Sequence, residues 1–214
     1  MNTVILFDFD GTVYDTVEGI TRSVQYAIRK QGLDAEPEAL RCFAGPPLVE
    51  KFMEVFGFDL ETANQAVADY RERYRPIGMY ECRVFPGIKD VLLTLRDHGY
   101  TLGIATSKPQ PLAEELLARE DMLGLFDAIV GAREDNDGTK AGVLRGVMAA
   151  LGAEPSRCVL VGDTKYDVAG AKTCGVACVG VRYGYAAEGE LEAAGADILV
   201  DSIPALGNYL LTLP

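Results

Sequence analysis

The sequence predicts a doubly wound α/β fold, in which a parallel sheet carries helices on both faces and a helical subdomain is inserted near the start. Short, continuously apolar runs alternate with segments of helical period, as expected when parallel strands are joined by right-handed crossovers. This alternation is broken between residues 15 and 83, where helical patterns follow one another without a convincing strand. A length of 214 residues leaves room for a core domain with such an insert.

Six runs have the composition of buried strands. The first, Thr3–Phe7, is β-branched, aromatic and apolar throughout, which is typical of a strand covered on both faces of a parallel sheet. The other five are Tyr100–Ala105, Phe126–Val130, Cys158–Val161, Val176–Val181 and, with a weaker pattern, Ile198–Val200. Ligands of such sheets bind beyond the carboxyl ends of the strands, so polar residues that follow these runs are candidate site residues.

Segments of helical period lie between the strands, and several of them stop near a glycine, such as Gly99, Gly152 or Gly175. The predicted core helices are Ile88–Asp97, Pro111–Arg119, Lys140–Leu151, Lys165–Thr173 and Glu188–Ala194.

The interval 15–83 contains the predicted helices Ile20–Lys30, Leu48–Val55 and Thr62–Tyr74. Pro and Gly in Pro76–Gly78 and Phe85–Gly87 mark the return of the chain to the core. We therefore predict an α/β core made of residues 1–14 and 84–214 and a helical cap made of residues 15–83.

Charge and composition narrow the functional classes. The chain is 49% hydrophobic and 24% charged, as in ordinary globular proteins. A formal charge of −12 without a Lys/Arg cluster repels nucleic-acid phosphates, so nucleic acid is not an expected partner. The same charge repels a small phosphorylated substrate, which must therefore be held by a strong local positive field such as a bound cation.

The apolar runs are all short. Val4–Phe7 and Val176–Val181 fall far below the length of about 20 residues that a membrane span requires, so no membrane association is expected. The first strand begins at Thr3, which leaves no room for a secretory signal. Five cysteines without a C-x-x-C pair suit reduced thiols, and we expect a cytoplasmic protein.

Acidic pairs follow two of the predicted strands. Asp8 and Asp10 come directly after the first strand and precede Gly11-Thr12, and Asp163 and Asp167 follow the strand Cys158–Val161. A single pair has a structural explanation, because aspartates accept hydrogen bonds from local amides at turns and helix N-caps. Oxygen ligands from two neighbouring strand ends suit a hard cation, and Mg²⁺ is the usual choice beside phosphate.

Two further segments carry groups that can bind an anion. Thr106-Ser107-Lys108 follows the strand Tyr100–Ala105, where hydroxyls and free amides can accept phosphate oxygens or cap a helix. Lys140 opens a predicted helix, where its charge faces the positive end of the helix dipole. A lysine in that position indicates a compensating anion or, equally, a solvated surface side chain.

These segments, in this order and over the whole chain, resemble the haloacid dehalogenase superfamily of phosphohydrolases, with a Rossmann-like core. The residues that carry the resemblance are Asp8-Phe9-Asp10-Gly11-Thr12, Thr106, Lys140 and Gly162-Asp163 with Asp167. The insert resembles the helical cap of the first type. Gly45-Pro46-Pro47-Leu48 and Val181–Tyr185 resemble the phosphoglycolate phosphatase-like branch.

The resemblance implies a role for each matching residue. Asp8 would attack phosphorus and form an aspartyl-phosphate, and Asp10 would protonate the leaving oxygen and later deprotonate water. Thr106 would bond a transferring oxygen and Lys140 would balance the charge of Asp8 and the phosphoryl group. Mg²⁺ would be held by Asp8, by the peptide carbonyl of Asp10 and by Asp163. Asp167 would either bind the ion, directly or through water, or brace Lys140. The predicted substrate-binding set is Gly11, Thr12, Ser107 and Lys108 in the core and Gly45 and Pro46 in the cap.

The charge of this predicted site needs a further cation or proton. Four ionised aspartates carry −4, whereas Mg²⁺ and Lys140 together carry +3, so the site would meet a phosphate dianion with a net negative charge. We therefore expect Asp10 to be protonated when substrate arrives, because a neighbouring carboxylate such as Asp8 favours the neutral form. Lys108 is the alternative to Lys140 as the motif lysine, since the proline that often follows that lysine is missing here.

The resulting expectation is a magnesium-dependent phosphomonoesterase that acts on a small metabolite such as phosphoglycolate, a nucleoside monophosphate or a sugar phosphate. A phosphosugar mutase would use the same Asp8 and Asp10. A dehalogenase would not need Asp163, so the complete acidic set argues against it. A regulatory module that binds phosphate without turnover is the non-enzymatic alternative.

Overall fold

The computed structural model describes residues 3–133 and 138–214. The chain divides into two compact units, one formed by Met1–Tyr14 with Val84–Pro214 and the other by Asp15–Arg83. We refer to them as the core unit and the second unit.

The core unit is built on a six-stranded parallel sheet in the order β5-β4-β1-β6-β7-β8. Its strands are β1 (Val4–Phe7), β4 (Thr101–Pro109), β5 (Ala128–Ala132), β6 (Cys158–Gly162), β7 (Ala177–Val181) and β8 (Ile198–Val200). The order reverses between β4 and β6, which flank the buried strand β1, and the predicted doubly wound α/β fold is thereby confirmed. In sheets of this kind the reversal point is where ligands bind.

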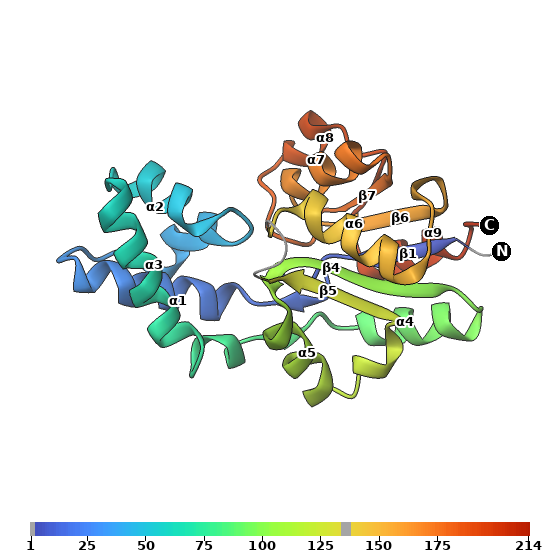
Figure 1. Cartoon of the computed structure of the whole chain (residues 1–214), viewed down its shortest axis with the longest axis horizontal. Coiled ribbons are helices and arrows are strands. Elements are labelled where there is room, and N and C mark those ends of the chain that lie inside the picture. The colour runs from blue at the N-terminus through green and yellow to red at the C-terminus, as the bar shows by residue number, and fades with distance from the viewer. Residues whose placement is uncertain (1–2, 134–137) are drawn as a thin grey trace. The chain divides into compact units, whose positions relative to one another are not determined.

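Helices cover both faces of the sheet (Figure 1). One group consists of α6 (Lys140–Leu151), α7 (Lys165–Cys174) and α8 (Glu190–Ala194). The other group consists of α4 (Ile88–Asp97), α5 (Gln110–Arg119) and α9 (Ile203–Leu210). An apolar cluster joins α6 and α7 to the sheet through fully buried side chains such as Leu6, Val147 and Leu160. This packing fixes the strand ends from which the functional side chains project.

The described secondary structure of the second unit is helical, except at the unit boundary. There β2 (Tyr14–Asp15) and β3 (Arg83–Val84) form a two-stranded ribbon. Its elements are α1 (Val17–Lys30), a 3₁₀ segment (Pro37–Phe43), α2 (Leu48–Phe56), α3 (Leu60–Tyr74) and a short 3₁₀ turn (Gly78–Tyr80). The rings of Phe43, Phe52, Phe56 and Phe58 pack together, with centroid distances between 4.9 and 6.2 Å for the contacting pairs. A small aromatic core of its own therefore stabilises this unit.

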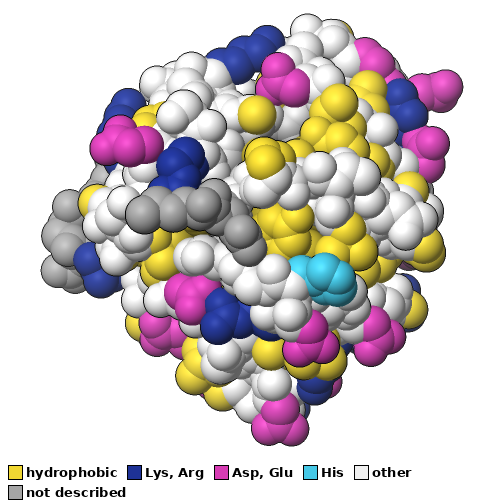
Figure 2. All heavy atoms as spheres, turned by 90° about the vertical axis from the view of Figure 1, so that its right-hand side faces the viewer, with side chains coloured by type: hydrophobic (Ala, Val, Ile, Leu, Met, Phe, Trp, Pro, Cys, Tyr) yellow, Lys and Arg dark blue, Asp and Glu magenta, His cyan; other side chains and the backbone are white. Residues whose placement is uncertain are grey.

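The apolar content of the helices and the distribution of surface charge agree with the expectations from composition. Among the described residues no helix combines the length and the apolar character that a membrane crossing requires. On the face drawn in Figure 2, acidic side chains alternate with Lys and Arg, and the basic groups do not form one continuous patch.

Candidate active site

The end of β1 brings Asp8 and Asp10 to the reversal point of the sheet. The Asp8 amide donates to the Val161 carbonyl at 2.8 Å, which continues the pairing of β1 with β6 up to the aspartate. The chain then turns back, and the amides of Val13 and Tyr14 both donate to the carbonyl of Phe9. This turn leaves the carboxylates of Asp8 and Asp10 at the end of the strand.

The end of β6 supplies the second acidic pair. Thr164, not Asp163, caps helix α7, so the alternative explanation of Asp163 as a helix cap is wrong. Asp167 accepts from the amide and the hydroxyl of Thr164 through Oδ2, at 2.9 and 2.8 Å. Asp163 and Asp167 are both fully buried, and burying charges at this density requires a compensating cation.

Lys140 provides part of that compensation. Its Nζ lies 2.6 Å from Asp8 Oδ1 and 2.8 Å from Asp167 Oδ1, and it donates to the Ala105 carbonyl at 2.9 Å. Helix α6 places this lysine at its first residue, and Gly170 makes the approach to α7 possible, because a Cβ there would lie 2.5 Å from Lys140 Cγ. The lysine that balances Asp8 in this structure is therefore Lys140 and not Lys108.

The charges in this cluster remain unbalanced. Burial, only partly offset by Lys140, raises the pKa of Asp8 to about 7, and the nearby carboxylates of Asp167 and Asp10 add to the increase. Burial, with Asp167 and Asp8 nearby, likewise raises the pKa of Asp163 far above its usual range. Burial opposes the charged form of Lys140, but Asp167 and Asp8 outweigh it and raise the pKa of its ammonium.

The same cluster fits a divalent cation. Asp8, Asp163 and Asp167 offer carboxylate oxygens that all lie within 4.8 Å of one another, and all three side chains are buried. They carry three negative charges when ionised against the single ammonium of Lys140. A hard cation with oxygen ligands would remove this excess, and Mg²⁺ has the required preference.

Asp10 has a different partner. Its Oδ1 and Oδ2 lie 3.0 and 3.4 Å from Nζ of Lys108, whose ammonium also lies 5.5 Å from the centroid of the Phe9 ring. The carboxylate of Asp10 is not among the oxygens that form the acidic cluster. Lys108 supplies a positive charge that the sequence-based count omitted, so Mg²⁺ together with Lys140 and Lys108 would offset the four aspartates, and the proton expected on Asp10 stays a prediction.

The segment of Thr106, Ser107 and Lys108 was predicted to follow its strand, and this is wrong in detail. Strand β4 continues to Pro109, and its register with β5 shifts between Ala105 and Pro109. Within this irregular stretch Thr106 and Lys108 are buried, whereas Ser107 is exposed. Thr106 Oγ1 accepts from the Lys108 amide at 3.1 Å, so its hydroxyl hydrogen is free to be donated elsewhere.

Gly11 and Thr12 both lie against the side chain of Asp163. Gly11 has a φ of +83°, and a Cβ there would lie 2.1 Å from Asp163 Oδ2, so only glycine fits. Thr12 is fully buried and its hydroxyl donates to Asp163 Oδ1 at 3.2 Å. The Thr12 side chain therefore holds Asp163, and a role of Thr12 in binding substrate stays a prediction.

The predicted cap residues lie in the second unit. Gly45 and Pro46 lie in the segment before α2, and their role in binding remains a prediction. Arg22 pairs with Glu18 and Glu81, and Lys51 pairs with Glu54. Each of these two side chains therefore has an acidic partner within the second unit.

Residues 183–185 contribute to the site and were not predicted to contact it. The Tyr185 amide donates to Asp163 Oδ2 at 2.8 Å, and the Tyr183 hydroxyl donates to the Thr12 carbonyl at 3.0 Å. The sequence signal was a glycine between two tyrosines directly after a strand, which shows a turn but not the residue that it meets.

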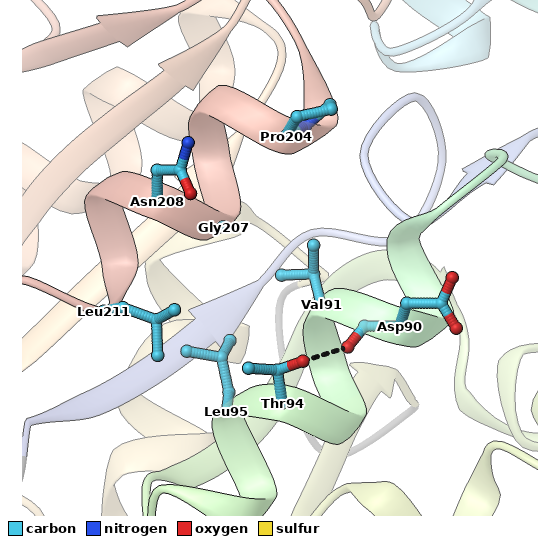
Figure 3. Close-up of a pocket in the computed structure, with 8 residues that line it drawn as sticks. All are labelled: Asp90, Val91, Thr94, Leu95, Pro204, Gly207, Asn208 and Leu211. Atoms are coloured by element: carbon cyan, nitrogen blue, oxygen red, sulfur yellow. Dashed lines mark hydrogen bonds between the residues drawn. The ribbon is translucent and has the colours of Figure 1, made fainter.

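A hollow of about 260 Å³ lies elsewhere in the core unit, between α4 and α9 (Figure 3). Its lining includes apolar residues such as Leu95 and Leu211, together with Asp90 and Asn208. The hydroxyl of Thr94 is already bonded to the Asp90 carbonyl at 2.8 Å. Lacking a cationic side chain in its lining, this hollow does not provide the chemistry of a phosphate site.

The sequence profile of the haloacid dehalogenase-like hydrolases matches residues 5–181, which includes every acidic residue of the site. The chain belongs to this family. A 5'-nucleotidase of Pseudomonas aeruginosa is 45% identical over 192 residues, covering 88% of this chain and 86% of that protein. A phosphoglycolate phosphatase of Cupriavidus necator is 34% identical, covering 97% of this chain and 93% of that protein.

Solved structures agree with this assignment. The crystal structure of a predicted phosphatase from Clostridium acetobutylicum has a TM-score of 0.94 and 39% identity, and it covers 100% of both chains. As a haloacid dehalogenase-like phosphatase, the protein is a hydrolase of phosphate monoesters with small phosphorylated substrates.

Proposed function

We propose that this phosphatase is magnesium-dependent, that it hydrolyses nucleoside 5'-monophosphates, and that Asp8 is its nucleophile. The observation that carries the mechanism is the buried cluster of Asp8, Asp163 and Asp167, in which Lys140 lies 2.6 Å from the attacking carboxylate. The 45% identity to a 5'-nucleotidase supports the nucleotide as substrate, ahead of phosphoglycolate or a sugar phosphate.

In the first step an oxygen of Asp8 attacks phosphorus, and the bond from phosphorus to the ester oxygen breaks. The ester oxygen takes a proton from Asp10 and leaves as the alcohol, while the phosphoryl group stays on Asp8 as an aspartyl-phosphate. This step requires a proton on Asp10, whose carboxylate would share the ammonium of Lys108 with a substrate phosphate. Lys140 remains against Asp8 and offsets the charge that accumulates there.

In the second step water attacks the phosphorus of the aspartyl-phosphate. Asp10, now ionised, takes a proton from this water, the acyl-phosphate bond breaks, and inorganic phosphate and the free carboxylate of Asp8 are formed. The same carboxyl group therefore serves as acid and then as base, which returns the site to its starting state after one turnover.

Other groups would bind and orient the phosphoryl oxygens. The Thr106 hydroxyl keeps its hydrogen available, because its oxygen already accepts from the Lys108 amide. Mg²⁺ held by Asp8, Asp163 and the carbonyl of Asp10 would neutralise phosphoryl charge, with Asp167 serving through Lys140. We also propose that residues 15–83 form the cap that selects the leaving group, with Gly45 and Pro46 as its substrate contacts.

A panel of phosphomonoesters, assayed with Mg²⁺ and with EDTA, tests this proposal. We expect turnover of nucleoside monophosphates to exceed that of phosphoglycolate and glucose 6-phosphate, and EDTA to abolish every activity. Undiminished turnover in EDTA would contradict the metal role, and a preference for phosphoglycolate would contradict the substrate. A requirement for a sugar bisphosphate would indicate a mutase instead.

A further inference from the structure

A short turn after β7, Tyr183-Gly184-Tyr185, closes over Asp163. The Tyr185 amide donates to Asp163 Oδ2 at 2.8 Å. Gly184 lies so close that a Cβ would be 2.2 Å from Asp163 Cβ and 2.4 Å from its Oδ2. The backbone of this turn is therefore fitted to the carboxylate, and a residue larger than glycine would displace one or the other.

The side chain of Tyr183 reaches the same carboxylate indirectly. Its hydroxyl donates to the Thr12 carbonyl at 3.0 Å, and the Thr12 hydroxyl donates to Asp163 Oδ1 at 3.2 Å. Together with the Tyr185 amide, these bonds form a closed circuit in which each oxygen of Asp163 has a donor from a different segment. Two strand ends and the loop after β1 are thereby tied together around one carboxylate.

The turn is itself firmly held. The Arg182 amide donates to the Val200 carbonyl at 2.9 Å, and the Arg182 guanidinium pairs with Asp201 at 2.6 Å. The Tyr183 ring meets Phe85 edge to face, with centroids 5.1 Å apart and an interplanar angle of 66°. A turn anchored on both sides can fix the orientation of a carboxylate that it contacts.

We infer that Tyr183 is a positioning residue that sets the affinity of the site for its divalent cation, by holding Thr12 and through it Asp163. This rests on the proposed function, in which Asp163 is a metal ligand. Groups that hold a ligating carboxylate determine its direction and basicity, and their loss typically weakens metal binding by about 10- to 100-fold.

The test compares Tyr183→Phe with Tyr100→Phe. Tyr100 is the matched control, because its hydroxyl also donates to a backbone carbonyl of the core unit, that of Leu213 at 2.6 Å, but not to a residue of the acidic cluster. Isothermal titration with MgCl₂, in the absence of substrate, measures the dissociation constant of each protein. We expect Tyr183→Phe to weaken Mg²⁺ binding by about 10-fold and Tyr100→Phe to leave it within about 2-fold of the wild type.

Melting temperatures in EDTA separate positioning from stability. Each variant loses one hydrogen bond to a carbonyl, so both should melt at slightly lower temperatures, and only Tyr183→Phe should also lose metal affinity. Gly184→Ala, which moves the turn against Asp163, should weaken binding more than Tyr183→Phe does. Unchanged Mg²⁺ affinity in a folded Tyr183→Phe variant would overturn the inference.

Asp163→Asn distinguishes this inference from the proposed function. Loss of Mg²⁺ binding in Asp163→Asn, together with wild-type binding in Tyr183→Phe, would leave the metal site in place and refute only the role of Tyr183. A wild-type protein that binds no Mg²⁺ would overturn both the proposed metal dependence and this inference.

Discussion

Among the residues that the structure describes, buried aspartates lie in two places, in helix α3 of the second unit and around the ends of β1 and β6 in the core unit, and their charge is balanced differently. Asp69 in α3 has a side chain that is only 4% exposed, and its Oδ1 lies 2.6 Å from Nζ of Lys30. Gln31 and Gln65 each donate to the same carboxylate at 3.2 Å. Lys30 also pairs with Glu72 at 2.7 Å, but Glu72 is exposed, so the one buried charge has an ammonium and two amides beside it.

In the core unit Asp8 and Asp167 share the ammonium of Lys140, and Asp163 completes a cluster of three buried carboxylates beside this single lysine. A mismatch of this kind is costly for folding, because an uncompensated buried charge destabilises the native state. Evenly matched charge is typical of a group that only stabilises, whereas an excess of one sign in a buried cluster is typical of a site that binds an ion. The comparison therefore separates a structural carboxylate from functional ones.

Removing the proposed nucleophile should have the largest effect on activity. We expect Asp8→Asn to lower kcat by at least about 10,000-fold, because the aspartyl-phosphate can no longer form. The metal-free variant should nevertheless melt at a higher temperature than metal-free wild type at pH 8, since one of the crowded charges is gone. Steady-state rates and thermal melts measure both quantities, and a variant that keeps more than a hundredth of wild-type kcat would contradict the assignment.

The two lysines of the site should differ in importance. Lys140→Met leaves the buried acidic cluster without its ammonium, and we expect a loss of about 1,000-fold in kcat. Lys108→Met removes the partner of Asp10 alone, and we expect a loss of about 10- to 100-fold. Rates at saturating Mg²⁺ give the ranking, and an equal or reversed order would show that Lys108 is the lysine that balances the nucleophile.

The strand ends made this site predictable from the sequence, because parallel strands deliver the residues that follow them to one edge. Asp8 and Asp163 are 155 residues apart and still meet for this reason. The pairing of Lys108 with Asp10 was not predictable, because it depends on the irregular end of β4, where the register with β5 shifts. Such a shift arises from packing between distant segments and leaves no periodic signal.

Helix α9 was also missed. Its sequence, Ile203–Leu210, contains Pro204 and Gly207, which weaken intrinsic helix propensity. Both residues have structural reasons: Pro204 lies in the first turn, and a Cβ at Gly207 would lie 3.0 Å from Val91 Cγ2 of α4. Tertiary packing against α4 therefore decides this helix, and local propensity does not.

Magnesium and pH should affect stability together. With the pKa of Asp8 raised to about 7, the folded metal-free protein binds a proton there more tightly than the unfolded chain, whose aspartates have a pKa of about 3.9. Stability therefore falls as the pH rises from about 4 to about 7, because the folded state must give up that proton. We expect the melting temperature in EDTA to decrease between pH 5 and pH 8.

The cation should reverse this loss where the carboxylates are ionised. Mg²⁺ should raise the melting temperature by several degrees at pH 8 and much less at pH 5, since binding to the folded state stabilises it only when the ligands are deprotonated. Asp8→Asn should reduce the decrease between pH 5 and pH 8 in EDTA, and Asp69→Asn should preserve it. The same Mg²⁺ effect at both pH values would contradict a shared carboxylate site.

Asp69→Asn should have the smallest effect on activity. The substitution keeps the shape of the side chain but removes the charge that Lys30, Gln31 and Gln65 surround, and hydrogen bonds to a charged group contribute about 1.5 to 3 kcal/mol each. We expect a loss of about 2 kcal/mol in the free energy of unfolding, measured by urea titration, with kcat within about 3-fold of wild type. If Asp69→Asn instead lowered kcat as Lys108→Met does, then a matched carboxylate would also serve catalysis, and local charge balance would not distinguish structural from functional aspartates in this protein.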